Sequence, residues 1–422
     1  MSSKSINASI ITIGDELLIG QTIDTNSAFI AQELNKIGIW VRRRVAVGDV
    51  YDDIWKALDE EGKDSHIVII TGGLGPTADD ITKPLLCKYF GGKLVVNEKV
   101  LAHVTYLFEK VLRRPGPMLE RNLKQAEVPD VCTVLHNERG TAPGMLFKKN
   151  GVIFISLPGV PHEMKGLMKS EVIPRLLASF ELPAIVHRTV FTAGQGESMI
   201  AELLMDFEPT LPEHIKLAYL PNYGMVKLRL TARGAKKEEV ENDLLPYFEK
   251  LQLLVKDFLV TNEDEGLEIV VGKILKAGHK TMGTAESCTG GFIAHLITSV
   301  PGSSVYFKGS VVSYANEVKE NILGVQQTTL ATAGAVSEGT VQEMVKGAIK
   351  TLNVDYALAT SGIMGPDGGS EQKPVGTVWI AAGNNQKIET LKLNLRFDRQ
   401  RNISMTAAYA LNFLRKFILA NS

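Results

Sequence analysis

The feature that most restricts the fold of this chain is a repeated order of strand-sized apolar runs, glycine-rich turns and helical patterns. Residues 66–70 (HIVII) are almost continuously apolar, and the glycine-rich stretch 71–75 (TGGLG) follows at once. The run 6–13 likewise ends at Gly14, and apolar residues then recur at helical spacing from Phe29 to Ile37. Strands without alternation are covered on both faces. Their alternation with helices predicts a doubly wound α/β domain with a parallel sheet.

The length of 422 residues predicts two or three domains, since one domain holds roughly 100–200 residues. We expect the first domain over residues 1–168, because a last strand at 152–157 leads into Pro158-Gly159. Strand and helix patterns then predict a small α+β module over 169–260. The acidic stretch 261–266 (TNEDEG) has no periodic apolar face and is the predicted linker. A final α/β domain is expected over 267–422, with strands at 310–314 and 356–361 among its elements.

Composition excludes several classes of protein. The formal net charge of −1 gives no basic surface for sequence-independent nucleic-acid binding. The longest apolar runs are far shorter than the ~20 residues of a membrane span, and no secretory stretch opens the chain. The three cysteines form no CxxC pair, which argues against a disulfide framework or a cysteine-rich zinc site. We therefore expect a cytoplasmic protein with no nucleic-acid or membrane partner.

The loop after the strand at 66–70 is a candidate phosphate site, because glycines let backbone N–H groups approach an anion at a helix N-terminus. It matches neither GxGxxG nor the Walker pattern, since Lys83 lacks the required spacing. A tight strand-to-helix turn is the alternative. Asp79, Asp80 and Thr82 add oxygen ligands suited to Mg²⁺, although Asp79 could simply cap the next helix. Asp15-Glu16 ends the first strand and is expected to face the same crevice.

Two serine-containing loops stand out in the last domain. Residues 285–291 (AESCTGG) follow a strand and open a helix, which suits a helix cap or a phosphate cradle. Cys288 has no histidine partner, so an inert buried thiol is favoured over a nucleophile. Ser303 and Ser304 follow Pro301-Gly302, and Lys319 lies in a helix after Tyr314. Ser–Lys pairs are known nucleophile systems. From these residues alone, however, a turn serine and a solvated lysine are favoured.

Four motifs run in order through the N-terminal third: GDELLxG at 14–20, Asp24-x-Asn26, TGGLGPTxDDxT at 71–82 and LPGVPxEM at 157–164. With this set of motifs, the N-terminal third resembles the molybdopterin-binding-like domain of CinA proteins. The resemblance implies a MoaB/MogA-like fold and a pyrophosphatase that acts on ADP-ribose with a divalent metal (Mg²⁺, Co²⁺ or Mn²⁺) and K⁺ as a further ion. Molybdopterin is the less favoured ligand. The implied nucleotide site comprises Gly14, Asp15, Glu16, Asn26, Thr71, Gly72, Gly73, Gly75, Thr77, Asp79, Asp80, Thr82, Pro158, Gly159 and Glu163, with Asp15 and Asp80 as metal ligands.

The last domain contains the motifs AESCTGG, PGSS, SYANEVK, GAVSE, SGIMGPDGG and KPVGTVW. With these motifs it resembles the C-terminal CinA domain, which also occurs alone as nicotinamide-nucleotide amidase. The resemblance implies hydrolysis of nicotinamide mononucleotide to nicotinic acid mononucleotide and ammonia, without a metal. It gives Ser304 as the nucleophile, Lys319 as its base and Tyr314 as an assisting group. The expected substrate-binding residues are Thr289, Gly290, Ser361, Gly362, Gly365 and Arg399.

One segment departs from the family pattern. The usual Gly-Asp-Arg is Phe397-Asp398-Arg399 here, and the second arginine four residues later is Ile403. Arg401 is a candidate replacement, and the departure bears on affinity more than on chemistry. The main hypothesis is a bifunctional enzyme that assembles as a homodimer. The alternatives are a protein with only one active site, and a non-enzymatic competence-related adaptor that binds nucleotides.

Overall fold

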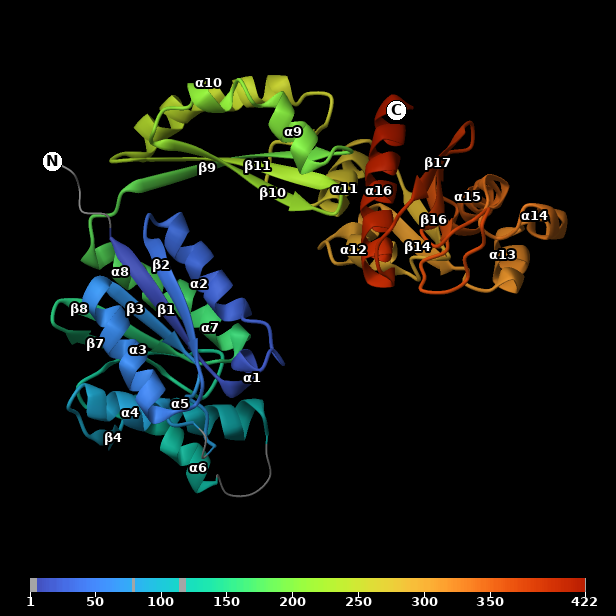
Figure 1. Ribbon diagram of the computed structural model, residues 1–422. Coiled ribbons are helices and arrows are strands. Elements are labelled where there is room, and N and C mark those ends of the chain that lie inside the picture. The colour runs from blue at the N-terminus through green and yellow to red at the C-terminus, as the bar shows by residue number, and fades with distance from the viewer. Residues whose placement is uncertain (1–5, 78–79, 114–118, 422) are drawn as a thin grey trace. The chain divides into compact units, whose positions relative to one another are not determined.

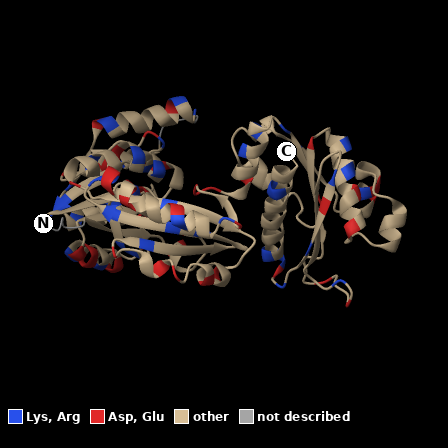
Figure 2. Ribbon diagram, turned by 90° about the horizontal axis from the view of Figure 1, so that it is seen from above, with Lys and Arg blue, Asp and Glu red and all other residues tan. Residues whose placement is uncertain are grey.

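The computed structural model describes residues 6–77, 80–113 and 119–421. The chain forms two compact units, Met1–Val186 with Ala232–Asn242, and His187–Thr231 with Asp243–Ser422. Basic and acidic residues are intermixed along the helices of each unit (Figure 2), in keeping with the small net charge. Within the described ranges, no helix combines the length and the apolar character that a membrane crossing requires.

The first unit is built on a six-stranded sheet in the order β2-β1-β3-β8-β7-β6. The first four of these strands are parallel; at one edge β7 pairs antiparallel with β8, and β6 pairs antiparallel with β7. The strands predicted at 6–13, 66–70 and 152–157 are present. The bounds are β1 (Asn7–Ile13), β2 (Trp40–Val47), β3 (Ile67–Thr71), β6 (Thr133–Leu135), β7 (Gly144–Lys149) and β8 (Val152–Leu157).

Alternate residues of these strands supply two separate cores, which is why the apolar runs are continuous. Ile10 and Ile69 pack with α2, α7 and α8 on one face, and Ile11 and Ile70 pack with α3 and α4 on the other (Figure 1). The predicted doubly wound α/β fold is confirmed. The helices are α1 (Asp15–Leu18), α2 (Thr25–Lys36), α3 (Tyr51–Asp64), α4 (Thr82–Tyr89), α5 (Glu98–Tyr106), α6 (Glu120–Leu123), α7 (Pro161–Leu167) and α8 (Ile173–Ser179), and a small ribbon pairs β4 (Leu94–Val96) with β5 (Glu127–Pro129).

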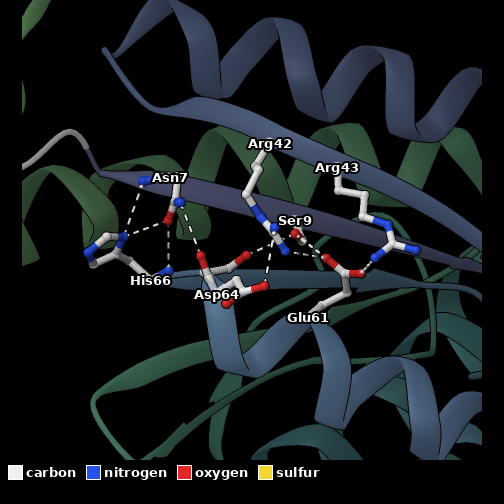
Figure 3. A network of polar contacts seen from close by, with 8 residues as sticks. Asn7, Ser9, Arg42, Arg43, Glu61, Asp64 and His66 are labelled. Atoms are coloured by element: carbon white, nitrogen blue, oxygen red, sulfur yellow. Dashed lines mark hydrogen bonds and ion pairs between the residues drawn. The ribbon is translucent and has the colours of Figure 1, made fainter.

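A polar network ties α3 to β1 and β2 near the amino ends of the strands (Figure 3). Glu61 is 1% exposed, accepts the Ser9 hydroxyl at 2.6 Å and pairs with Arg42 and Arg43 at 3.4 and 3.2 Å. A buried carboxylate is tolerated only when it is paired and hydrogen-bonded. Since ligands of such sheets bind at the carboxyl ends of the strands, we assign this network to the stability of the fold.

A four-stranded sheet in the order β10-β11-β9-β12, with two helices, lies mainly in the second unit, although the start of β9, the end of β11 and the start of α10 belong to the residues of the first unit. The predicted linker follows this sheet, and its acidic side chains are ion-paired: Asp264 with Lys227 at 2.6 Å, and Glu263 and Glu265 with Lys273 at 2.8 and 2.7 Å. The elements are β9 (Ala184–Ala193), β10 (Ile215–Asn222), β11 (Met225–Gly234), β12 (Leu259–Thr261), α9 (Glu197–Leu203) and α10 (Lys237–Leu254).

The C-terminal sheet of this unit has the order β14-β13-β15-β16-β17. Helices α11, α12 and α16 contribute to the core on one face, and α13 and α15 to the core on the other. The predicted α/β class is confirmed, although β14 begins at Phe307 and not near residue 310. The bounds are α11 (Leu267–Ala277), β13 (Met282–Glu286), α12 (Phe292–Thr298), β14 (Phe307–Val312), α13 (Asn316–Leu323), α14 (Gln327–Thr332), α15 (Glu338–Leu352), β15 (Tyr356–Gly362), β16 (Thr377–Gly383), β17 (Ile388–Asn394) and α16 (Arg399–Ala420).

Candidate active site

The carboxyl ends of three parallel strands meet at one edge of the C-terminal sheet. Strand β13 pairs in parallel with both β14 and β15, so the segments that follow these strands emerge side by side. Open α/β sheets bind their ligands at this edge. A cavity of about 200 Å³ opens here, and it is lined by Ser287, Cys288, Tyr314, Asn316, Lys319, Ala335, Val336, Ser361, Gly362, Met364 and Arg399.

Lys319 reaches the cavity from α13 and is only 1% exposed. Its Nζ donates to the carbonyl oxygens of Ser313 at 2.7 Å and Tyr314 at 3.2 Å. Burial lowers the pKa of Lys319, because desolvation disfavours the ammonium form. A neutral lysine amine has two N–H groups and one lone pair. With both N–H groups on carbonyls, the lone pair is left to accept a proton, as a general base requires.

Ser287 enters the same cavity from the end of β13. Its N–H donates to the Thr360 carbonyl of β15 at 2.9 Å, which fixes the backbone where the strand gives way to the loop. Ser287 is 8% exposed and lines the cavity together with Lys319. A hydroxyl and a lysine with a lowered pKa in one small cavity are the two groups of a Ser–Lys nucleophile system. The structure therefore brings Lys319 together with Ser287.

Ser304, the predicted nucleophile, lies at the opposite end of β14. It belongs to a short helical turn, Ser303–Val305, directly before that strand, whereas Tyr314 and Lys319 follow the strand. The strand has 6 residues, and at about 3.3 Å per residue it spans about 20 Å. Ser304 is also exposed and does not line the cavity. Within one chain, Ser304 and Lys319 therefore lie well beyond the hydrogen-bond reach of about 3 Å, and their pairing stays a prediction.

The backbone N–H groups at the N-terminus of α12 are hydrogen-bonded by a side chain of the protein itself. The buried Glu286 carboxylate accepts the backbone N–H groups of Gly291, Ile293 and Ala294 at 3.1, 3.0 and 2.8 Å. Thr289 is 3% exposed and donates its hydroxyl to Glu286 at 2.7 Å, and the Gly290 N–H donates to the Ser287 carbonyl. Neither Thr289 nor Gly290 lines the cavity. Internal hydrogen bonds therefore hold Thr289 and Gly290, and their role as substrate ligands stays a prediction.

Cys288 is a poor nucleophile in this setting. It lies next to Ser287 and is 5% exposed. Burial raises the pKa of its thiol to about 12, so the reactive thiolate is scarce at neutral pH. This environment agrees with the interpretation of Cys288 as an inert buried residue.

Arg399 connects three segments around the cavity. Its Nη1 donates to the Gly365 carbonyl at 2.9 Å, and its Nη2 donates to the Tyr314 hydroxyl at 3.1 Å. Tyr314 is 63% exposed and Arg399 opens α16, so both lie where an incoming substrate could meet them. Gly365 acts here through its carbonyl and is not among the residues that line the cavity.

Ser361 and Gly362 line the cavity at the end of β15, as predicted, but each also has a structural task. The Ser361 hydroxyl donates to the Ala335 carbonyl at 2.7 Å, which holds one wall of the cavity in place. A Cβ on Gly362 would lie 2.8 Å from the Val378 side chain, so this position requires a glycine. Their contact with substrate stays a prediction.

Arg401, the candidate replacement for the second arginine, lies away from the cavity lining. Its guanidinium lies over the Phe397 ring, 4.1 Å from the ring centroid, and it does not line the cavity. Ile403 occupies the position of that arginine and packs against the hydrophobic core. Arg399 is thus the arginine that lines the cavity.

The first unit gathers several of its predicted residues at the carboxyl ends of β1, β3 and β8. Asn26 Nδ2 donates to the Thr71 hydroxyl at 3.2 Å and to the Gly159 carbonyl at 2.7 Å, and the Thr71 hydroxyl donates to the Pro158 carbonyl at 2.9 Å. Gly72 lies against this group, since a Cβ on Gly159 would be 3.4 Å from its Cα. Gly14 follows β1 directly, and a Cβ there would clash with the Glu16 carboxylate.

The predicted metal ligands are engaged in their own loops. Asp80 accepts the Gly75 and Thr77 N–H groups at 2.7 and 2.9 Å, and Asp15 Oδ1 accepts the Asp49 N–H at 3.1 Å. A Cβ on Gly73 would lie 2.1 Å from the hydroxyl of the buried Thr82. Asp79 lies outside the described residues. Within the described ranges, no three acidic, histidine or cysteine side chains gather as a metal-binding group.

Glu163 belongs to a neighbouring contact that the motifs did not reveal. Asn137 Nδ2 donates to Glu163 at 2.6 Å and to the Ala142 carbonyl at 2.8 Å. A Cβ on Gly140 would lie about 2.0 Å from the same carboxylate. Burial raises the pKa of Glu163. Glu163 therefore anchors the loop at 137–142.

The fold and its two strand-edge sites define a multidomain α/β protein with one candidate ligand site at the parallel strands of each of its two larger sheets. Residues 9–178 match the family model "Probable molybdopterin binding domain", residues 187–260 match "Damage-inducible protein CinA KH domain", and residues 264–418 match "CinA C-terminal domain". The chain belongs to the CinA family.

Full-length relatives support this assignment. A CinA-like protein of Cytophaga hutchinsonii is 48% identical over 411 residues, covering 97% of this chain and 98% of that protein. A CinA-like protein of Flavobacterium psychrophilum is 48% identical over 417 residues, covering 99% of each chain. Apart from these full-length relatives, the chain is similar over part of its length to the crystal structure of the competence/damage inducible protein CihA from Agrobacterium tumefaciens, which is 35% identical and covers 36% of this chain and 92% of that one, with a TM-score of 0.35.

Proposed function

We propose that the C-terminal domain is an amidase that hydrolyses the carboxamide of nicotinamide mononucleotide to nicotinic acid mononucleotide and ammonia. The observation that carries this proposal is the single small cavity that Ser287 and Lys319 line together at the carboxyl edge of the sheet. The match of residues 264–418 to the CinA C-terminal domain supports the class of reaction. The substrate follows from the resemblance to nicotinamide-nucleotide amidase.

The chemistry requires only groups of this chain and water. Ser287 Oγ attacks the carboxamide carbon while Lys319 Nζ takes the hydroxyl proton. Lys319 then gives this proton to the departing nitrogen, the C–N bond breaks, and ammonia leaves an ester on Ser287. A water molecule attacks the ester, Lys319 takes its proton and returns it to Ser287 Oγ, and the carboxylic acid is released.

Other residues of the cavity would bind the substrate. Arg399 offers a guanidinium to the phosphate or to the carboxamide oxygen, since its planar fork suits both groups. The Arg399–Tyr314 hydrogen bond orients the tyrosine hydroxyl near the same region. Ala335, Val336 and Met364 supply apolar surface that suits a pyridine ring.

Ammonia release from nicotinamide mononucleotide tests this proposal. Ser287→Ala should abolish turnover, because the attacking oxygen is removed, whereas Ser304→Ala should retain wild-type turnover within about twofold, as is usual for exposed turn positions. The reverse pattern, with Ser304→Ala inactive and Ser287→Ala active, would refute the assignment of the nucleophile. A wild-type protein that releases no ammonia would refute the amidase proposal itself.

We propose, second, that the first unit cleaves ADP-ribose at its diphosphate. The convergence of Asn26, Thr71 and Gly159 with the glycine loop at the carboxyl ends of β1, β3 and β8 favours this site. Mg²⁺ is commonly held by one or two carboxylates together with substrate phosphate oxygens and water. Asp80 and Asp15 fit that limited role, and a bound ion would neutralise diphosphate charge.

Release of AMP from ADP-ribose with added Mg²⁺, Co²⁺ or Mn²⁺ tests the second proposal. Asp80→Asn should lower this activity, and undiminished cleavage would remove Asp80 as a metal ligand. The two assays together also address the alternatives. If one assay is silent, only one site is active. If both are silent under varied metals, the adaptor function is favoured.

A further inference from the structure

Asn402 is a fully buried amide beside the proposed amidase site. It lies on α16, three residues after Arg399, and is 0% exposed. Its Nδ2 donates to the carbonyl oxygens of Met364 at 3.1 Å and Phe397 at 2.9 Å, and its Oδ1 accepts the Phe397 N–H at 3.3 Å. One side chain therefore joins the segment after β15 to the turn that precedes α16.

The same two segments hold Arg399. Met364 directly precedes Gly365, whose carbonyl accepts Arg399 Nη1 at 2.9 Å. Phe397 lies two residues before Arg399, in the turn that starts the helix. A change in the distance between these two segments would move the Gly365 carbonyl, which accepts from the guanidinium, and the backbone of Arg399 relative to each other. The Asn402 hydrogen bonds fix that spacing.

The orientation of Arg399 matters more in this chain, because Ile403 stands where the family has its second arginine. Ile403 packs against the core, and the Arg401 guanidinium lies over Phe397 away from the cavity lining. Recognition of an anionic group then depends on the single guanidinium of Arg399. Directional recognition by one guanidinium requires a fixed orientation, and a displacement of about 1 Å can cost as much as 100-fold in rate.

We propose that Asn402 is a positioning residue that sets the Arg399 guanidinium for binding the phosphate or carboxamide of the substrate. The proposal rests on the amidase function proposed above. Asn402 touches protein backbone and acts through Arg399.

Steady-state ammonia release by Asn402→Leu tests this role, with Asn412→Leu as the matched control. Asn412 is also buried on α16, but it accepts a hydrogen bond from Arg415 and lies ten residues further along the helix, about 15 Å away. Asn402→Leu should raise KM about tenfold and change kcat less than about threefold, because binding is misaligned while Ser287 and Lys319 are untouched. Asn412→Leu should lower Tm without changing KM. Equal KM values for Asn402→Leu and the wild type would overturn the proposal.

A double variant separates positioning from simple stability. If Asn402 acts through Arg399, Asn402→Leu should add nothing to the KM of Arg399→Ala, since coupled residues are not additive. Full additivity of the two effects would overturn the proposal. If Asn402→Leu does not fold, Asn402→Asp serves instead, because it keeps an acceptor for the Phe397 N–H and removes both donated bonds. It should raise KM in the same direction, and an unchanged KM would count against the role.

Binding measurements keep this test independent of turnover. If the wild-type protein releases no ammonia, the amidase proposal fails, and calorimetric titration with nicotinamide mononucleotide replaces the kinetic assay. A Kd about tenfold weaker in Asn402→Leu than in Asn412→Leu supports the positioning role, on the same misalignment argument. Equal Kd values, or no binding by the wild-type protein, overturn it.

Discussion

Two buried lysines, one in each unit, have closely similar surroundings. Lys83 on α4 donates its Nζ to the carbonyl oxygens of Lys124 and Gln125, each at 3.2 Å, and Lys319 on α13 donates to those of Ser313 and Tyr314. Burial lowers the pKa of both side chains, that of Lys83 to about 8. On these grounds alone, either lysine could be taken for a catalytic base.

Their neighbours differ in a way that separates their roles. The carboxylates of Glu127 and Asp80 raise the pKa of Lys83 and so favour its charged form. For Lys319, the electrostatic contribution that raises its pKa comes from the Cys288 thiol. Lys319 also lines a cavity that contains the Ser287 hydroxyl. A lowered pKa therefore shows only that a lysine is buried. A nucleophilic group in the same cavity is the observation that indicates a catalytic base.

The largest expected difference between the two lysines is in ammonia release. Lys319→Met should lower kcat for nicotinamide mononucleotide about 10²–10⁴-fold, because it removes the proposed base that takes the Ser287 proton. Lys83→Met should leave kcat unchanged. Initial rates at saturating substrate provide the measurement. Substantial turnover by Lys319→Met would remove Lys319 as the base.

A smaller effect is expected from the arginines of α16. Arg399→Ala should raise KM about 10-fold to 100-fold, since a charge-assisted hydrogen bond is stronger than a neutral one. Arg401→Ala is the control and should leave KM within about twofold, because it removes an exposed cation–π contact. Substrate titrations of both variants provide the measurement. Similar KM changes in the two variants would show that Arg401 shares in binding.

The comparison also predicts how stability depends on pH. Lys83 has a pKa of about 8 in the folded protein and 10.5 as its ordinary value, so the unfolded chain binds more protons between these two pH values. The contribution of Lys83 to the free energy of unfolding should therefore rise with pH across this window, by up to about 3 kcal/mol. Lys83→Met should flatten that rise. Urea unfolding of the first unit at pH 7.5 and pH 10 measures the change in its free energy of unfolding between these pH values. An equal change in the variant and the wild type would contradict the burial of a titrating lysine.

Cys288→Ala should have the smallest effect. Because the pKa of the thiol is about 12, little thiolate exists at neutral pH, and ammonia release should change less than about threefold, as expected for a modest core substitution. A loss of activity comparable to that of Ser287→Ala would instead make Cys288 part of the chemistry.

Much of the fold was accessible from the sequence, because buried parallel strands produce continuous apolar runs. The runs at 66–70 and 152–157 became β3 and β8, and the strand predicted at 356–361 became β15. The start of β14 was misplaced, because the residues from Phe307 to Gly309 mix apolar, charged and glycine positions.

The separation of Ser304 from Lys319 within one chain had a signal in the sequence. A strand was predicted between Ser304 and Tyr314, and a strand separates the groups at its two ends. The serine that directly follows the neighbouring strand, Ser287, is the one that parallel pairing places beside Ser313 and Tyr314. By contrast, no sequence pattern reveals that Glu286 fills the N-terminus of α12, or that Asn402 joins Met364 to Phe397, since both depend on tertiary packing.

The most direct test of the central claim is to locate the ester intermediate. Reaction of the full chain with nicotinamide mononucleotide, quenched in acid and digested, can be analysed by peptide mass spectrometry. The assignment predicts an acyl adduct on Ser287 in the peptide that carries AESCTGG, and its absence from the Ser287→Ala protein. An adduct on Ser304, or one that persists in Ser287→Ala, would contradict the placement of the active site at the carboxyl edge of the sheet.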